Sequence, residues 1–397
     1  MSWLDEVLLQ TKDYESPRQF WYWSALAALS AVVKDKVWVE REGDLPVFLN
    51  IYILLFAKSG FRKGPPINLA KQLVQRVNNT RVISGRSSVE AIIEELKEVQ
   101  TDPKTKTIIT DSCGFILASE FSSAIVRSEQ ALNILTDLYD RKYNEGEFAI
   151  RLIRTGKNIL KNPIITLLGG INEAHFESFM EDKDITGGFI GRTFIIHADG
   201  RSRINSLMYK MEQTINYEKL TDHLKLARQL QGPLIIEDKG KEIYNGWYNS
   251  FYNGPNEDKT GTFERVGDSA LKIAGLLSIA RSMDMIVSVK DIITGIQLAE
   301  GFVNSAKHVT FTIHEEESIS TMKKRVLKIL VKRQDHRITR QVLLSNLHGV
   351  MNADDLNKIC ETLEQAGLIK VSMIGDNVII EMTKSALEKF QHVFEGE

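Results

Sequence analysis

The sequence predicts an α/β protein whose core is a mainly parallel sheet, followed by a helical segment and a small C-terminal module. Three patterns support this class. Apolar runs of strand length alternate with amphipathic stretches of helix length over residues 36–205. Residues 215–312 have an almost entirely helical pattern, and residues 314–397 read as helices followed by two alternating strands. Strands that alternate with helices favour a parallel sheet, because each helix returns the chain to the edge where the previous strand began.

The composition is that of an ordinary globular protein. A chain of 397 residues with 43% hydrophobic and 26% charged residues is long enough for two or three domains with a buried core. Its longest apolar runs are well short of the roughly 20 residues of a membrane helix, and residues 1–15 lack the features of a signal peptide. Two distant cysteines, Cys113 and Cys360, fit a reducing compartment. We therefore expect a cytoplasmic protein without a membrane partner.

The first half of the chain is expected to hold a helical lead-in, residues 1–35, and the α/β core, residues 36–205. Within the lead-in, the aromatic run at residues 20–23 reads as core or subunit packing, with a base-stacking platform as the alternative. Helices of the core should begin where a proline occupies a tolerated first turn or a serine caps the helix. The expected strands are 36–42, 47–56, two short ones within 105–121, and 162–171; the expected helices are 65–78 and 87–99.

The second half changes character. Residues 206–313 are expected to be a helical segment, and the acidic stretch "HEEESIS" at 314–320 is the best candidate for a linker. Beyond it come three expected helices and two strands around a Gly-Asp-Asn turn. Three helices followed by a two-stranded wing is the winged-helix arrangement, which is assigned to residues 314–397.

The stretch "FAKSGFRKGPPIN" has the outline of a phosphate-binding loop between a strand and a helix. Such a loop needs converging backbone N–H groups, a helix N-terminus and a cation. Ser59 and Gly60 supply a flexible turn, and Lys63 supplies the cation. Arg62 is a second cation, and Gly64 begins the helix without a side chain. The alternative is a basic turn with no ligand.

The loop departs from the pattern G-x-x-x-x-G-K-[ST] at three positions. Ala57 and Arg62 replace glycines, and Gly64 replaces the hydroxyl residue that binds magnesium. Since Pro65 offers no hydroxyl either, magnesium would be held by Ser59 or by acidic residues and water.

Polar residues at the ends of later strands complete an expected site. Glu120, after the apolar "FILAS", is the carboxylate expected to orient water and magnesium, with Asp111 as second choice and a helix-capping acid as the alternative for Glu120. Asn172 ends a buried strand and could sense the γ-phosphate. Arg192 follows a glycine-rich turn and could reach a neighbouring subunit's nucleotide, the alternative being a surface ion pair.

These motifs together resemble a known family, the phage and mobile-element P-loop proteins described as replicative-helicase-like and related to AAA+ and MCM-like ATPases. The resemblance covers roughly residues 10–312 and rests on "FWYWSALAALS", "SGFRKG", "ILASEF", "LTDLYD", "NPIITLLGG", "GGFIGRTFII" and "ERVGDSALKIAGLLSIA". It implies a P-loop (AAA+/RecA-like) three-layer ATPase core with a helical lid at 206–313, ATP and magnesium as cofactors, and the cytoplasm of a bacterial host.

The resemblance also implies roles for individual residues. Lys63 would be the phosphate lysine, Glu120 the Walker B acid and Asn172 a sensor. Arg192 would be an arginine finger, and Arg265 a second sensor arginine on the helical lid. The form "SGxRKG" of the loop is usual in this family.

A DNA contact is expected at two local patches, because the net charge of −2 gives no global signal. Residues 147–163 read as a β-hairpin with Lys157 at or near its tip, flanked by Arg151, Arg154 and Lys161. In ring-shaped helicases of the AAA+ type, such a hairpin carries a basic tip into the central channel. The alternative is a solvated hairpin edge.

The second patch lies at the start of the C-terminal module, where basic residues suit phosphate contacts. Its alternatives are a solvated helix face or a dock for proteins. The patch contains Lys323, Lys324, Arg325, Lys328, Lys332, Arg333, Arg337 and Arg340.

The sequence therefore predicts an ATP-dependent DNA motor that forms a ring, expected to be a hexamer, and works on single-stranded or forked DNA as a replicative helicase. Other replication proteins could dock on the winged helix. Two alternatives stay open: a helicase loader or DNA-remodelling ATPase without unwinding, and a non-hydrolysing nucleotide-binding scaffold or winged-helix regulator.

Overall fold

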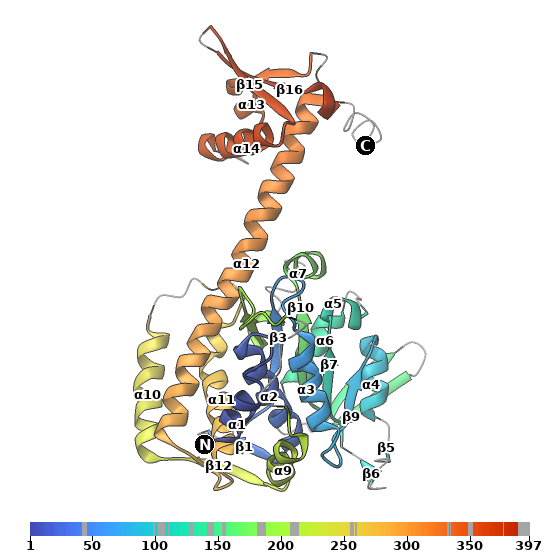
Figure 1. Cartoon of the computed structure of the whole chain (residues 1–397), viewed down its shortest axis with the longest axis vertical. Coiled ribbons are helices and arrows are strands. Elements are labelled where there is room, and N and C mark those ends of the chain that lie inside the picture. The colour runs from blue at the N-terminus through green and yellow to red at the C-terminus, as the bar shows by residue number, and fades with distance from the viewer. Residues whose placement is uncertain are drawn as a thin grey trace. The chain divides into compact units, whose positions relative to one another are not determined.

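The computed structural model describes the chain in two compact units, Met1–His308 and Val309–Glu397, which are treated separately below (Figure 1). Residues outside the description are 42–45, 98–99, 102–107, 110, 127–129, 141–146, 153–155, 181–187, 207–213, 255–257, 259, 332, 334, 348–351, 376 and 388–397. Only the backbone is described at residues 100–101, 108–109, 147–152, 156–159, 161, 177–178, 307–321, 324 and 374.

The first unit is built on a five-stranded parallel sheet, which confirms the α/β class. Its strands, in spatial order, are β11 (Thr193–His197), β3 (Tyr52–Phe56), β10 (Ile164–Ile171), β7 (Cys113–Ala118) and β4 (Val82–Ser84). Every residue of β3 and β10 is buried. These strands are continuous apolar runs because helices cover both faces of the sheet.

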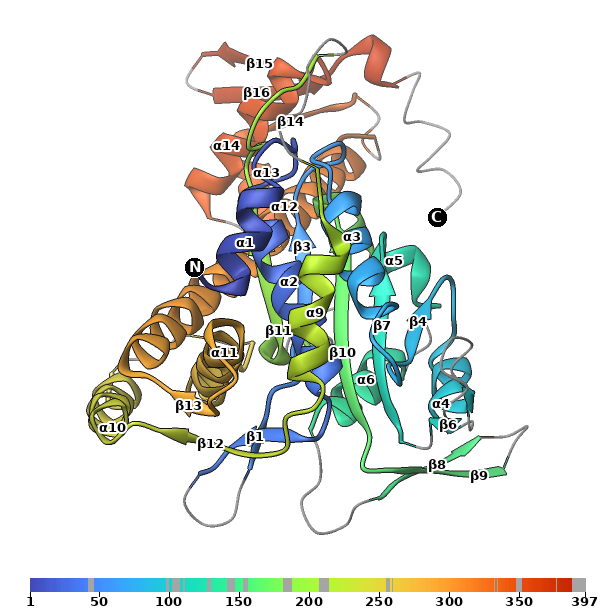
Figure 2. The same cartoon turned by 60° about the horizontal axis from the view of Figure 1, so that its bottom comes forward.

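Helices on the two faces follow from the direction of the crossovers. The chain passes from β3 through α3 (Gly64–Val74) to the far strand β4, and later returns from β7 through α6 (Ala131–Tyr139) to β10. Right-handed crossovers in opposite directions place α3 and α6 on opposite faces. α2 (Arg18–Val33) and α9 (Tyr217–Ala227) pack beside α3 on its face (Figure 2). α4 (Val89–Lys97) packs against α6.

The aromatic run of the lead-in is core, as expected. It lies in α2, where Phe20, Trp21 and Trp23 are buried. Trp23 packs edge-on against Phe194 of β11 and against Phe302, with ring centroids 5.8 and 5.2 Å away. Preceding it, α1 (Trp3–Gln10) begins at a capping box formed by Ser2.

A second sheet corrects the prediction of an all-helical segment after residue 205. Its strand order is β13 (Ile286–Val287), β12 (Gly232–Ile236), β1 (Val37–Val39) and β2 (Val47–Phe48). β12 pairs in parallel with β1, nearly two hundred residues earlier in the chain. Local sequence patterns do not reveal such a pairing, so β12 was missed. The helices around this sheet are α10 (Asp238–Tyr252), η2 (Phe263–Arg265), α11 (Val266–Arg281) and α12 (Val289–Val331).

The predicted linker at 314–320 is wrong, because these residues lie within the continuous helix α12. Glutamates are good helix formers, and neither glycine nor proline interrupts residues 302–331. The expected hairpin is confirmed: β8 (Glu147–Leu152) pairs antiparallel with β9 (Gly156–Lys161). Remaining short elements of this unit are β5 (Gln100–Thr101), β6 (Ile108–Ile109), α5 (Phe121–Ala124), α7 (Glu173–Phe179) and η1 (Ile190–Arg192).

The C-terminal unit contains the end of α12, two further helices and a three-stranded antiparallel sheet of order β14-β16-β15. The hairpin was expected, whereas the first strand of this sheet was not. The unit has its own buried apolar core. Its elements are β14 (Arg337–Thr339), α13 (Arg340–Asn346), α14 (Ala353–Gln365), β15 (Ile369–Ile374) and β16 (Asn377–Met382).

Candidate functional site

Three of the predicted site residues meet at the carboxyl edge of the central sheet. Lys63 follows β3, Asn172 follows β10 and Glu120 follows β7, and β10 lies between the other two strands. Because the strands are parallel, the segments that leave their carboxyl ends lie along one edge, the usual ligand-binding edge of an open α/β sheet.

Two left-handed residues shape the loop between β3 and α3. Gly60 has φ +86°, which glycine adopts without cost. Arg62 has φ +55°, at a position where the loop pattern has glycine, and this conformation costs a non-glycine residue roughly 1–2 kcal/mol. Ser16 donates a hydrogen bond of 2.7 Å from Oγ to the Arg62 carbonyl, which helps to hold that backbone. Ser59 is exposed at the turn.

Lys63 is folded back over its own loop. Its Nζ donates to the carbonyl oxygens of Ala57 and Lys58 at 2.7 and 3.2 Å, and the residue is only 8% exposed. Burial lowers the pKa of the ammonium group, while the carboxylates of Glu120 and Glu173 act in the opposite direction. The ammonium group therefore lies in the field of two acids without pairing with either.

A glycine in β10 allows this close packing. A Cβ at Gly170 would lie 2.7 Å from the Ser119 carbonyl oxygen and 3.4 Å from the Cβ of Lys63. Only a residue without a side chain lets the loop and the end of β7 approach β10 so closely.

Glu120 and Asn172 are joined by a histidine that the sequence reasoning did not single out. His175 Nδ1 lies 2.9 Å from Glu120 Oε1 and 3.2 Å from Asn172 Nδ2. Asn172 caps α7, because its Oδ1 accepts the His175 backbone N–H at 2.9 Å. Glu120 occupies the N-cap position of α5 but makes no side-chain capping bond there. The Glu120 side chain therefore does not cap α5, contrary to the alternative interpretation of this residue.

Asp111, the second choice for a magnesium ligand, is placed elsewhere. It precedes β7 and therefore lies at the amino edge of the sheet, about 20 Å of strand away from Glu120. Its Oδ2 pairs with Lys34 Nζ at 2.7 Å, and its Oδ1 accepts the Cys113 N–H. The structure therefore does not bring Asp111 together with Glu120: Asp111 precedes β7 of the central sheet, and the strand that it follows, β6, belongs to a separate two-stranded sheet.

Arg192 and Arg265 lie together, also at the amino edge. Arg192 directly precedes β11, whose first residue pairs with the first residue of β3. Its Nε donates to Asp140 Oδ2 at 2.8 Å and its Nη1 to the Gly188 carbonyl at 3.0 Å. Burial and then the nearby Arg192 lower the pKa of Arg265. Arg265 thus lies beside Arg192 at the amino edge, whereas Lys63 lies at the carboxyl edge of the same sheet. The structure does not bring Arg265 to the phosphate loop of its own chain.

A cavity of about 260 Å³ opens beside these arginines. Arg265, Asp140 and Asp268 line it together with Lys272, which is 7% exposed. Lys272 Nζ donates to the carbonyl and the side-chain oxygen of Asn50 at 2.9 and 2.8 Å. Burial lowers the pKa of Lys272 to about 7.

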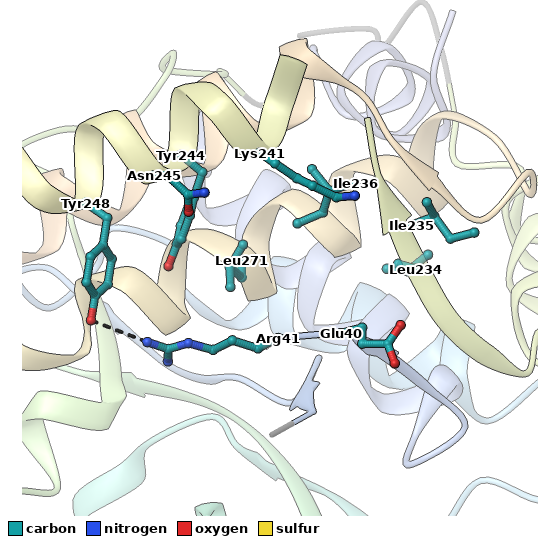
Figure 3. A pocket seen from close by; sticks show the side chains of 10 residues that line it. All are labelled: Glu40, Arg41, Leu234, Ile235, Ile236, Lys241, Tyr244, Asn245, Tyr248 and Leu271. Atoms are coloured by element: carbon teal, nitrogen blue, oxygen red, sulfur yellow. Dashed lines mark hydrogen bonds between the residues drawn. The ribbon is translucent and has the colours of Figure 1, made fainter. Parts of the chain in front are cut away.

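A larger cavity of about 560 Å³ adjoins the first through Arg41, which borders both (Figure 3). Arg41 donates to Asp268 at 2.7 Å and to the Tyr248 hydroxyl at 3.3 Å. Tyr244 projects from α10 into the same region, is 9% exposed, and its hydroxyl has no hydrogen-bond partner within the part of the chain that the structure describes. The cavity is lined by Glu40, Arg41, Leu234, Ile235, Ile236, Lys241, Tyr244, Asn245, Tyr248 and Leu271.

The predicted DNA-binding residues are divided between the units. In the hairpin, Lys157 pairs with Arg151, one position before the last paired residues, and is thus near the tip. Arg154 lies outside the described residues, and the side chains of Lys157, Lys161 and Lys324 are not described. In the C-terminal unit, Lys323 is half-buried, Arg337 pairs with Asp335 at 3.2 Å, and Arg340 donates to Asn357 Oδ1 at 2.9 Å.

No protein-family model matches the chain, and no curated protein matches it. Among the described residues, no helix is long and apolar enough to cross a membrane.

Proposed function

We propose that the chain is an ATP-dependent DNA motor that works as a ring of identical subunits, with the activity of a replicative helicase. The observation that supports this most is the separation of two sets of polar and charged side chains. Lys63, Glu120 and Asn172 lie at the carboxyl edge of the sheet, while Arg192 and Arg265 lie at the amino edge.

The loop residues fit the phosphates of ATP. The backbone of residues 58–63 turns through two left-handed positions before α3, so its N–H groups and the helix N-terminus present a positive end. Lys63 is partly desolvated, and within the described part of the chain its ammonium group is bonded to carbonyl oxygens of its own loop, so it can exchange these for phosphate oxygens.

Glu120 and Glu173 are the residues that would hold magnesium. Magnesium in nucleotide sites is commonly bound by one or two carboxylates together with phosphates and water, so a loop without a hydroxyl at Gly64 does not prevent binding. When bound, the ion would neutralise the charge that develops on the phosphates. Glu120 would orient the attacking water, and His175 and Asn172 would fix the direction of its carboxylate.

Arg192 would act on the nucleotide of a neighbouring copy. The five residues of β11 separate it from the carboxyl edge by about 16 Å, which exceeds the reach of its side chain. An arginine that stabilises transition-state charge can be supplied in trans. Within the chain it is held by Asp140, and Arg265 beside it would approach the same neighbour.

DNA would be gripped by the hairpin of β8 and β9 and by the C-terminal unit. The C-terminal unit would act as a winged helix, and its helices α13 and α14 together with the hairpin of β15 and β16 support a contact with DNA phosphates or with replication proteins.

The test is ATP turnover with and without single-stranded DNA, followed by strand displacement on a forked duplex. We expect DNA-stimulated turnover in the wild type and a loss of at least about 100-fold in Lys63→Ala, as for removal of other electrostatic catalytic groups. Absence of DNA-stimulated turnover would refute the motor. Turnover without strand displacement would identify a loader or remodelling ATPase instead.

A further inference from the structure

Two segments that are far apart in the sequence meet beside the phosphate loop. They are residues 13–18, before α2, and residues 201–205, which follow β11. Arg203 pairs with Asp13 at 2.6 Å, and Asn205 Nδ2 donates to the Asp13 carbonyl at 2.8 Å. The Ser202 N–H donates to the Glu15 carbonyl at 3.0 Å. The second segment is therefore held at the carboxyl edge by several bonds to the first.

Glu15 connects both segments to the loop. Its Oε2 accepts from Arg62 Nε at 2.8 Å, and its Oε1 accepts from Arg201 Nη1 at 3.2 Å and from the Asn205 N–H at 3.1 Å. The hydrogen bond from Asn205, and next that from Arg62, lower the pKa of this carboxyl. Two guanidinium groups thus share one carboxylate, so the group of Glu15, Arg62 and Arg201 carries one positive charge in excess.

Arg201 extends over the turn of the loop itself. A Cβ built on Gly60 would lie 3.8 Å from Arg201 Nη2, the end of the guanidinium that is not bonded to Glu15. A guanidinium carries five N–H donors in a fixed fork, and its geometry suits phosphate oxygens. Arg201 is one-third exposed, so part of this fork faces the loop mouth.

We propose that Arg201 is a phosphate-binding residue of this site, supplied in the same chain from the segment after β11, and that it takes a nucleoside triphosphate or another polyphosphate. The proposal rests on the proposed function of the loop. It also gives a role to Arg62, which stands where the loop pattern has glycine. Glu15 binds the guanidinium groups of both Arg62 and Arg201 and so connects Arg201 to the loop.

The experiment is direct binding of a fluorescent N-methylanthraniloyl-ATP, in the presence of magnesium, to the full chain. Inorganic tripolyphosphate serves as a competitor that carries no base. The variants are Arg201→Ala, Arg201→Lys, Glu15→Gln and Lys63→Ala. Arg203→Ala is the matched control, because Arg203 is an ion-paired arginine of the same segment. Circular dichroism melts establish that each variant is folded.

Arg201→Ala should weaken binding of both the nucleotide and tripolyphosphate by about 10- to 100-fold, the contribution of a charge-assisted hydrogen bond. Arg201→Lys should recover part of this loss, and Arg203→Ala should change binding by less than about twofold. An Arg201→Ala affinity equal to that of Arg203→Ala would overturn the proposal. Glu15→Gln should weaken binding less than Arg201→Ala does, because it removes the anchor but leaves the Arg201 guanidinium in place.

Failure of the proposed function would look different. If Lys63→Ala binds the nucleotide as the wild type does, the loop is not the phosphate site and both ideas fall. If Lys63→Ala loses binding and Arg201→Ala keeps it, only the role of Arg201 is excluded.

Discussion

Replacing the buried lysine of the amino-edge cavity should change how stability depends on pH. Lys272 is buried, its ammonium group is bonded to two oxygens of Asn50, and burial lowers its pKa from 10.5 to about 7. In the unfolded chain the group keeps its ordinary pKa. Lys272→Met keeps the length and the apolar stem of the side chain but removes the titrating group.

The sign follows from proton binding. Between pH 7 and 10.5 the unfolded chain binds a proton at Lys272 that the folded chain does not, so the folded state gains stability as pH rises through this window. The difference of about 3.5 pKa units corresponds to an upper limit of about 5 kcal/mol, at 1.36 kcal/mol per unit. Below pH 7 both states are protonated, and the contribution is constant.

The assay is chemical unfolding of wild type and Lys272→Met at several pH values from 6.5 to about 10. All other titrating groups are common to both proteins, so the difference in the free energy of unfolding isolates Lys272. We expect the wild type to gain several kcal/mol of stability relative to Lys272→Met as the pH rises across this range. A difference that stays constant would show that Lys272 titrates normally, and the reasoning from its burial would be refuted.

Four further substitutions test the packing around the proposed sites. Tyr244→Phe removes a buried hydroxyl that has no hydrogen-bond partner in the described chain. The free energy of unfolding should therefore stay equal or rise by up to about 1 kcal/mol, which a thermal melt measures. A clear loss of stability would show that the hydroxyl makes a hydrogen bond. Gly170→Ala places a methyl group 2.7 Å from the Ser119 carbonyl oxygen, so it should lower the free energy of unfolding by about 1–3 kcal/mol and weaken nucleotide binding. Gly64→Ala is the control, because its Cβ would lie in open space, and its stability should be nearly unchanged. Equal melting of these two alanine variants would contradict the packing argument. Arg62→Gly relieves a left-handed backbone but breaks the pair with Glu15, so its stability should stay within about 1 kcal/mol of the wild type while nucleotide binding weakens.

The sequence predicted the central strands β3 and β10 well because they are buried on both faces, whereas the edge strand β4 was not predicted. β3 and β10 are uninterrupted apolar runs, and such runs between helical patterns are recognisable without a partner strand. β12 was not recognisable, because it is short, contains Pro233 and gains its partner β1 from a distant part of the chain. The linker prediction relied on acidic composition, which also favours helix.

The residues of the candidate site that directly follow a strand of the parallel sheet could be predicted from the sequence. Lys63, Glu120 and Asn172 all come after parallel strands, so the sheet brings them to one edge. Asp111 comes before its strand, and the same rule places it at the opposite edge. His175, Glu15 and Arg201 were missed because the contacts that tie them to Glu120, Arg62 and Glu15 span 47 or more residues in sequence, and no local spacing marks such contacts. Arg265 was assigned by resemblance, and its place beside Arg192 is a tertiary contact.

The most direct test of the central claim is ATP turnover by mixtures of Lys63→Ala and Arg192→Ala subunits. Each variant alone lacks one half of the proposed composite site. In rings mixed at equal ratio, about a quarter of the interfaces (one half times one half) would combine an intact Lys63 with a neighbour's intact Arg192. We predict that the mixture regains up to about a quarter of the wild-type rate. A mixture no more active than the two variants measured separately would contradict the account.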